Sequence, residues 1–288
     1  MRPIRCILNA DDVGRTPSIN AAIIKAHTEG VLTSCSLMVS GEAFTEAAHL
    51  AHEHPALGVG LHLVLVCGKS VLPPSAIPHL ASVQGRFSAH AVIAGLRYFC
   101  SAAAQQEVRR EINAQLERFL ATNLPCSHVD SHFHMHMHPA VFDLVLEAAE
   151  GFGIKHLRLP NEELWLHLRL SRRWPPDFLT AATFTLLYRR NVKRAKARGF
   201  IFAERVYGLL QTNRLDEAYL CDLLQNLGGQ TNELYCHPDT ATERGKVELQ
   251  ALLSPNVTQT VARLRLQLID YTALEAPSPG TMSRRGRE

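Results

Sequence analysis

The sequence predicts an α/β protein built around a parallel sheet. Short apolar segments that fit buried strands alternate with amphipathic segments that fit helices along nearly the whole chain, which is typical of parallel sheets, either open or closed into a barrel. The 288 residues are 46% hydrophobic and 20% charged, as in ordinary globular proteins. Barrels of this length are commonly single domains.

The strands are expected where short apolar runs end in polar residues or turns. We predict them over residues 4–8, 33–39, 57–65, 126–132, 154–159, 234–236 and 266–270. Glycines interrupt the run at 57–65, which indicates that another part of the chain approaches this backbone closely.

Helices are expected between these strands because apolar residues recur there at helical spacing. We predict them over residues 18–29, 42–52, 106–122 and 140–151, with Ser18 as the N-cap of the first. Residues 73–88 are rich in proline and predict a loop. Residues 1–275 are expected to form one domain with a helical insertion at about 161–230, and residues 276–288 a disordered tail.

The insertion contains a strongly basic part. Residues 169–198 contain nine basic residues and one acidic residue, Asp177, around an apolar and aromatic run at 178–188. Such a stretch can lie on an anionic membrane surface. A solvated helix with a packed apolar face explains it as well. We favour this second interpretation, because runs of charged residues are usually solvated.

The composition excludes several classes of protein. A net charge of +3 is too small to argue for nucleic-acid binding. The seven cysteines form no C-x-x-C pair, which favours reduced thiols in a cytoplasmic protein. The apolar start of the chain is too short for a signal peptide, and no apolar run is long enough for a membrane span.

A histidine-dense tract is the most informative local feature. Five of the fifteen histidines lie within residues 128–138, and four of them, from His132 to His138, occupy every second position. In an extended strand these four side chains would point to one face. A row of imidazoles indicates a metal site, a proton-transfer site, or both, although a solvated loop or an edge strand can also carry such a tract.

Polar residues at the ends of the predicted strands should meet at one edge of the sheet. Asp12, His62 and His132 would give a set of two imidazoles and one carboxylate, which leaves positions open for water and substrate. The neighbouring carboxylate of Asp11 could take a proton from that water. Taken singly, the aspartates could be turn or capping residues, His62 a buried core histidine, and His237 a turn residue.

The same residues resemble those of a known family, the YdjC-like carbohydrate deacetylases. The segments that carry the resemblance are NADDVG at 9–14, GLHL at 60–63, HVDSHFHMH at 128–136, LRLP at 157–160 and ELYCHP at 233–238. They occur in the family's order between residue 4 and about residue 270. One position departs from the pattern, because Val13 replaces a common aromatic residue, and only local packing depends on it.

The resemblance implies a distorted (β/α) TIM-like barrel and a hydrolase that removes an acetyl group from an N-acetylated amino sugar. It implies Asp12, His62 and His132 as ligands of one divalent metal, with zinc first and magnesium, cobalt, manganese or iron as alternatives. Asp11 is then the general base and His237 the general acid. The side chains expected to bind substrate or to orient the ligands are Asp130, His134, His136 and Arg158.

Within the family, the closest resemblance is to the hopanoid-biosynthesis-associated deacetylases. The segments AGLRYF at 94–99 and RFLAT at 118–122 carry it, together with the basic stretch after Pro160. It implies a glycolipid substrate. With such a substrate the basic stretch is expected to contact the inner face of the cytoplasmic membrane, and a homodimer is one possible assembly.

Three other functions stay open from the sequence. The enzyme could deacetylate soluble chitooligosaccharides. It could be a different metal hydrolase on the same barrel, such as a phosphoesterase or an amidohydrolase, because the H-x-H spacing permits one. It could also be a catalytically silent carbohydrate- or lipid-binding protein, which the complete set of site residues argues against.

Overall fold

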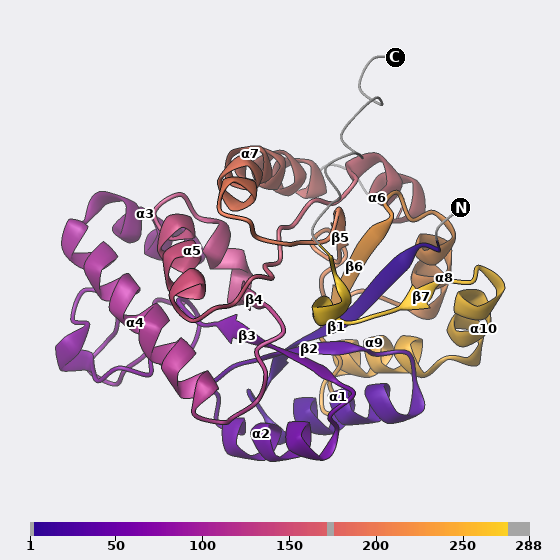
Figure 1. The fold of residues 1–288 in the computed structure, drawn as a ribbon, viewed down its shortest axis with the longest axis horizontal. Coiled ribbons are helices and arrows are strands. Elements are labelled where there is room, and N and C mark those ends of the chain that lie inside the picture. Colours follow the sequence, from indigo (N-terminus) through magenta and orange to yellow (C-terminus); the bar gives the residue numbers. More distant parts are fainter. Residues whose placement is uncertain (1–2, 172–175, 276–288) are drawn as a thin grey trace.

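The computed structural model describes residues 3–171 and 176–275, and a seven-stranded sheet forms its core (Figure 1). The strand order is β4-β3-β2-β1-β6-β5, β7 also pairs with β1, and every pairing is parallel. The strands are β1 (Arg5–Val13), β2 (Ser34–Leu37), β3 (Gly58–Leu63), β4 (Val129–Ser131), β5 (Arg205–Tyr207), β6 (Thr231–Cys236) and β7 (Gln267–Leu268). The predicted parallel α/β architecture is therefore confirmed.

Helices surround this sheet, and two groups of them stand out in Figure 1. In one group α1, α2 and α9 lie side by side, and in the other α3, α4 and α5 lie beside β3 and β4. The α-helices are α1 (Pro17–Glu29), α2 (Phe44–Glu53), α3 (Ala91–Cys100), α4 (Ala102–Leu120), α5 (Phe142–Gly151), α6 (Leu164–Ser171), α7 (Pro176–Ala197), α8 (Glu217–Gln225), α9 (Glu243–Leu253) and α10 (Pro255–Arg263). Three short 3₁₀ helices are η1 (Pro74–Ala76), η2 (His132–Met137) and η3 (Tyr271–Ala273).

The first strand is central to the sheet and extends further than predicted, to Val13 instead of residue 8. Its second half carries a bulge: Ala10 pairs with Cys35 and Val13 with Leu37, so that β1 has one residue more than β2 over this interval. Asp12 has a φ of 69° within the bulge. An extra residue re-aims side chains that would otherwise alternate between the two faces, and it changes the directions of Asp11 and Asp12.

The glycines of the third strand do allow a close approach, as predicted. A Cβ atom on Gly60 would lie 2.3 Å from Cε1 and Nδ1 of His128. The His128 ring is fully buried, stacks on Tyr271 at 3.9 Å between ring centroids, and its Nδ1 lies 2.9 Å from Oγ of Ser127. These contacts leave the ring no space into which it could retreat.

We therefore expect Gly60→Ala to lower the free energy of unfolding by about 1–3 kcal/mol, the usual cost of overpacking a core. The matched control is Gly151→Ala at the end of α5, where an added Cβ meets nothing within 4 Å; its effect should be neutral or slightly stabilising. Urea unfolding measures both variants. Equal midpoints for Gly60→Ala and the wild-type chain would contradict the close approach.

Two predictions of local structure are wrong. The first helix begins at Pro17 and not at Ser18, and its N-cap is Thr16, whose hydroxyl accepts a hydrogen bond from the Ile19 amide. Proline suits the first helical position because its fixed φ fits the helix and no partner is needed for a missing N–H. The histidine tract is not a strand either, because β4 ends at Ser131 and η2 follows, with φ of 54° at Phe133 and 51° at His134.

Other predicted elements are present only in part, and some elements of the structure were not predicted. Residues 154–159 are no strand, but His156 and Leu157 form single parallel bridges to Ile201 and Val129. Residues 73–88 are irregular apart from η1 and the single antiparallel bridges Lys69–Arg86 and Ala81–Phe87, as expected for a loop. The sequence reasoning missed α3, β5, α8, α9 and α10 as separate elements.

The basic stretch after residue 169 is helical where the structure describes it. On α7 the side chains of Arg190, Arg194 and Arg198 form ion pairs with acidic residues of α5, namely Asp143 and Glu150. These three contacts favour a helix that packs on its neighbour over one whose charges all face a membrane. Arg172, Arg173 and the predicted tail at 276–288 lie outside the described residues, and none of the described helices is long and apolar enough to cross a membrane.

Candidate metal and active site

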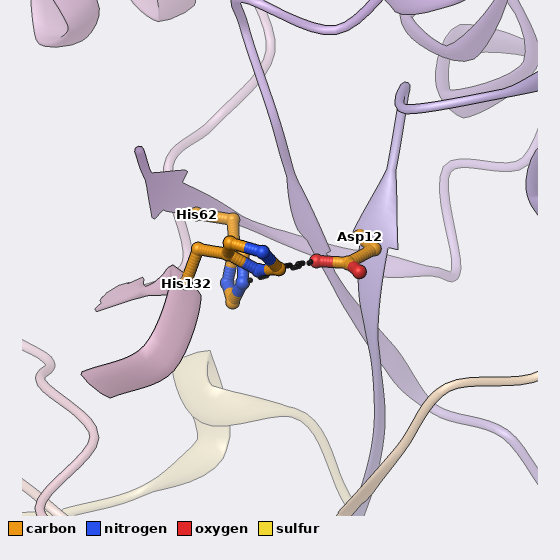
Figure 2. A group of neighbouring side chains, drawn as sticks. All are labelled: Asp12, His62 and His132. Atoms are coloured by element: carbon orange, nitrogen blue, oxygen red, sulfur yellow. Dashed lines mark ion pairs between the residues drawn. The ribbon is translucent and has the colours of Figure 1, made fainter. Parts of the chain in front are cut away.

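Three side chains from three different elements converge at the carboxyl ends of β1, β3 and β4. Asp12 lies in the bulge of β1, His62 on β3 and His132 directly after β4 (Figure 2). Oδ1 of Asp12 lies 3.0 Å from Nδ1 of His132 and 3.4 Å from Nε2 of His62. The three candidate ligand atoms all lie within 4.8 Å of one another, and all three residues are buried. The structure thus brings together the set that the sequence predicted.

The Asp12 carboxylate suits a cation. Its Oδ1 is buried and accepts no hydrogen bond of good geometry from the described residues, although two imidazole nitrogens face it. Burial alone would raise the pKa of Asp12, but its contacts with His132 and His62 outweigh burial and hold that pKa well below the usual range. A buried, ionised oxygen that faces two imidazoles matches the donor set of zinc and similar divalent ions.

The environment of His62 also favours positive charge. Burial alone would lower the pKa of His62, but the carboxylates of Asp130, Asp11 and Asp12 raise it to about 10. Surroundings that favour positive charge on this imidazole also favour a divalent cation that would replace the proton on its nitrogen. The donor atoms and the charge of the cluster therefore both fit a metal.

Asp130 orients His62 from behind. Its Oδ1 lies 2.7 Å from Nδ1 of His62, so that Nε2 is left to face Asp12. Its Oδ2 accepts hydrogen bonds from Oγ of Ser36 at 2.8 Å and pairs with Arg158 at 2.6 Å. A carboxylate in this position can fix the tautomer and ring position of a ligand histidine, which is the role that the sequence analysis expects of Asp130.

Arg158 is the centre of the charge network below the site. Its side chain is fully buried and donates to both carboxylate oxygens of Asp11 at 2.8 Å. It also pairs with Glu233 at 2.7 Å and lies over the ring of Tyr235 at 4.5 Å. One guanidinium thus neutralises part of the charge of three buried acids: Asp11, Asp130 and Glu233. The Arg158 side chain therefore does not face solvent, and it holds Asp11 in position.

Asp11 and His237 lie on the same side of the site. Asp11 also accepts a hydrogen bond from Nδ2 of Asn9 at 2.9 Å, and Nε2 of His237 lies 3.9 Å from its Oδ2. The main-chain amide of His237 donates to Glu248 at 2.5 Å, which fixes this residue after β6. The side chain of His237 keeps 20% of its surface exposed, whereas that of Asp11 keeps 3%, so that His237 is the more accessible of the two groups.

The histidines that follow His132 in the tract contact neighbouring residues instead of Asp12. His136 contacts Oγ of Ser131 at 2.6 Å and the main-chain oxygen of Arg158 at 2.9 Å, and Nε2 of His134 lies 2.8 Å from the Tyr235 hydroxyl. Burial lowers the pKa of His136 to about 4 and that of His134 well below its usual value. Both imidazoles are therefore neutral at pH 7 and unsuited to donate a proton there. His138 packs against Gly95 of α3.

The sequence reasoning missed several residues of this site. Ser36 and Asn9 connect β1, β2 and β4 through side-chain hydrogen bonds, and Glu233 shares Arg158 with the aspartates. Glu233 stands in the ELYCHP segment that the sequence analysis used, and it lies three residues from the end of a buried strand. A buried acid in a strand indicates a partner of opposite charge, and this signal could have identified it.

Comparisons with known proteins match the part of the chain that contains these site residues. The sequence model of the family described as YdjC-like protein matches residues 5–263. A carbohydrate deacetylase of Geobacillus stearothermophilus is 33% identical over 281 residues, which cover 93% of this chain and 97% of that protein. A chitooligosaccharide deacetylase of Serratia marcescens is 30% identical over 263 residues, 89% of this chain and 93% of that one. A carbohydrate deacetylase of Brevibacillus brevis is 42% identical over 63% of this chain and 68% of its own length.

A solved structure has the same fold. It is a putative cellobiose-phosphate cleavage protein from Enterococcus faecalis, with a TM-score of 0.74 at 23% sequence identity over 94% of this chain and 98% of that one. At this identity the likeness concerns the fold alone.

Proposed function

The chain belongs to the YdjC-like protein family, and we propose that it is a metal-dependent hydrolase that removes the N-acetyl group from an N-acetylglucosamine-type sugar. The observation that carries the proposal is the convergence of Asp12, His62 and His132 beside Asp11. The relatives described as carbohydrate and chitooligosaccharide deacetylases support the same chemistry.

In this proposal Asp12, His62 and His132 hold one divalent cation. When bound, such a cation polarises a carbonyl group and lowers the pKa of a water molecule. Asp11, held by Arg158 and Asn9, accepts the proton of the attacking water. His237, within 3.9 Å of Asp11, gives a proton to the departing amine, which must leave as a neutral molecule. His134, neutral and beside Tyr235, lines the substrate site.

The position of Arg158 separates this proposal from a two-metal phosphoesterase. Among the described residues a second group that could hold a cation is Asp11, His62 and Asp130. However, Nη1 of Arg158 lies 2.8 Å from Oδ2 of Asp11 and 2.6 Å from Oδ2 of Asp130. The guanidinium already takes the place of a second cation, and the two groups share His62. The arrangement therefore favours one metal per chain.

The proposal includes the shape of the sheet. We propose that it curves into a distorted (β/α) barrel in which residues 154–159 lie between β4 and the chain at residue 201. The bridges Val129–Leu157 and His156–Ile201 support this closure. Helices α6, α7 and α8 of the stretch at 161–230 then form an insertion at the rim, whereas β5 of the same stretch pairs with β6 within the sheet.

Removing one ligand should remove the metal. We expect His62→Ala to lose the stoichiometric cation and acetate release together, because two ligands from separate elements hold a divalent ion much less tightly than three. His138→Ala is the matched control: it belongs to the same tract but packs against α3 and should keep the metal. Equilibrium dialysis against zinc measures both. A metal content that falls only in His138→Ala would contradict the ligand set.

Two substrates test which group is attached to the N-acetylated sugar, a lipid or a second sugar. We propose a hopanoid glycolipid, on the resemblance of the 94–99, 118–122 and basic segments, and the Serratia relative makes soluble chitooligosaccharides the second candidate. Acetate release is measured from an N-acetylglucosaminyl hopanoid in detergent and from diacetylchitobiose. Release from the lipid alone supports the glycolipid, and release from diacetylchitobiose alone replaces it with the soluble sugar. No release from either would contradict the deacetylase proposal.

A further inference from the structure

Helix α3 exposes an apolar face to solvent. Four large side chains point outward from it: Val92 is 84% exposed, Leu96 63%, Phe99 61% and Ile93 53%. Positions i, i+1, i+4 and i+7 fall on one side of a helix, so these residues form one continuous strip, which we call the α3 strip. Contiguous exposed apolar surface on a folded protein usually marks a site of contact.

The exposure is fixed by the packing of the helix. On its opposite side Ala94 and Tyr98 are buried, and the Tyr98 hydroxyl donates to the main-chain oxygen of Leu65 at 2.6 Å. Gly95 lies against His138, with 3.1 Å from an added Cβ to Nε2. The helix therefore cannot rotate to bury the α3 strip without breaking these contacts.

The helix that carries the α3 strip contains a positive charge and no acidic residue. The sequence between Glu53 and Glu107 contains no acidic residue, whereas it contains Lys69, Arg86 and Arg97. Arg97 lies on α3 itself and is exposed. At the other end of the strip Arg190 donates to the main-chain oxygen of Pro139, next to His138. Ion pairs offset two of the other cations, because Glu42 pairs with Lys69 and Asp143 with Arg190, which leaves Arg97 as the cation on α3 itself.

An exposed apolar strip beside a positive charge favours an anionic lipid surface over a second copy of the chain. A second copy placed on the α3 strip by two-fold symmetry would bring Arg97 of one chain toward Arg97 of the other, which like charges oppose. An anionic lipid surface matches both features, because apolar side chains of an interfacial helix enter the acyl boundary while cations contact the headgroups. We propose that the α3 strip docks this protein on an anionic membrane.

The α3 strip is close to the candidate active site. The ring of Phe99 lies edge-to-face with that of His138, 6.4 Å between centroids, and His138 directly follows η2, which begins at His132. One short 3₁₀ helix thus separates the docking surface from a predicted metal ligand. A sugar carried on a membrane lipid would meet the site near the level of the headgroups. The docking proposal does not depend on which bond the site cleaves.

The test is flotation of the purified full chain with vesicles of phosphatidylcholine, with and without phosphatidylglycerol, at low salt. We expect the wild-type chain to float with the anionic vesicles and to be released as salt is raised. Leu96→Asp should bind about tenfold to a hundredfold more weakly, because it removes an apolar side chain that would enter the acyl boundary and adds a charge that anionic lipid repels. Val247→Asp, at a 43% exposed position on α9, is the matched control and should float like the wild type.

Three results would overturn the proposal. The wild-type chain could fail to float with anionic vesicles, or Leu96→Asp could float as well as Val247→Asp. Loss of binding in Leu186→Asp on α7 but not in Leu96→Asp would place the contact on the basic stretch instead. Acetate release from diacetylchitobiose is measured on every variant, so that a failure of docking and a failure of the proposed chemistry are distinguished. A wild-type dimer that Leu96→Asp converts to monomers would assign the α3 strip to a second copy.

Discussion

Replacing Arg158 with methionine is expected to lower the free energy of unfolding by about 3–5 kcal/mol, the cost of leaving buried charges without their partner. Asp11, Asp130 and Glu233 all contact this guanidinium, and the four side chains are almost completely buried. Methionine has a similar volume, so lost packing contributes little. The urea midpoint is measured in the presence of chelator, because a bound metal would offset part of the charge.

The matched control for this variant is Arg194→Met. Arg194 pairs with Asp143 at the surface, where 48% of its side chain is exposed, and exposed ion pairs contribute at most about 1 kcal/mol. We expect the two variants to differ clearly in midpoint. Equal midpoints would show that the buried network does not depend on Arg158.

Asp11→Asn is expected to lower kcat by about 10²–10⁴-fold, the usual contribution of a general base. The amide keeps the size of the side chain, but it cannot take a proton from water. Arg158 retains Asp130 and Glu233 as partners, so the variant should fold. Because Asp12, His62 and His132 are unchanged, it should still bind one equivalent of metal, as measured by equilibrium dialysis.

Asp12→Asn provides the contrast, because the neighbouring carboxylate is the predicted ligand. It should lose both metal and turnover, whereas Asp143→Asn on α5 should lose neither. Retained turnover in Asp11→Asn would rule out Asp11 as the base. Loss of metal from Asp11→Asn would instead favour the second candidate group, which contains Asp11, His62 and Asp130.

The strand ends were the part of the site that sequence could predict. Asp12, His62 and His132 follow or occupy segments whose apolar character marks them as strands, and parallel strands bring such ends to one edge. The bulge in β1 could not be predicted from the sequence. Aspartate occurs in many backbone conformations, so an aspartate at position 12 did not indicate a φ of 69° there. The sequence therefore predicted where the candidate ligands meet, but not how the side chains of two consecutive aspartates both reach this place.

The expectation that alternate histidines point to one face of a strand is wrong for a physical reason. Alternation at every second position fits a strand, but η2 turns the chain after Ser131 with positive φ at Phe133 and His134. Only His132 then faces Asp12, and the others bind Ser131, Tyr235 or α3. Backbone strain at bulky residues persists only where surrounding contacts hold it, and those contacts are long-range.

The role of Arg158 and the exposure of α3 depend on tertiary packing. The LRLP segment placed Arg158 near the site, but its three acidic partners come from β1, β4 and β6. An apolar strip on α3 could equally have faced the core, and only the burial of Tyr98 and Ala94 on the opposite side shows that it does not.

Acetate release from diacetylchitobiose or the N-acetylglucosaminyl hopanoid, whichever is cleaved, tests the central claim most directly when one preparation is measured three times. The first measurement uses the protein as purified with one equivalent of zinc, the second follows removal of metal with a chelator, and the third follows the return of zinc. We predict release, loss of release and recovery, with no recovery in His62→Ala. Undiminished release from protein shown to contain no metal would contradict a metal-dependent deacetylase.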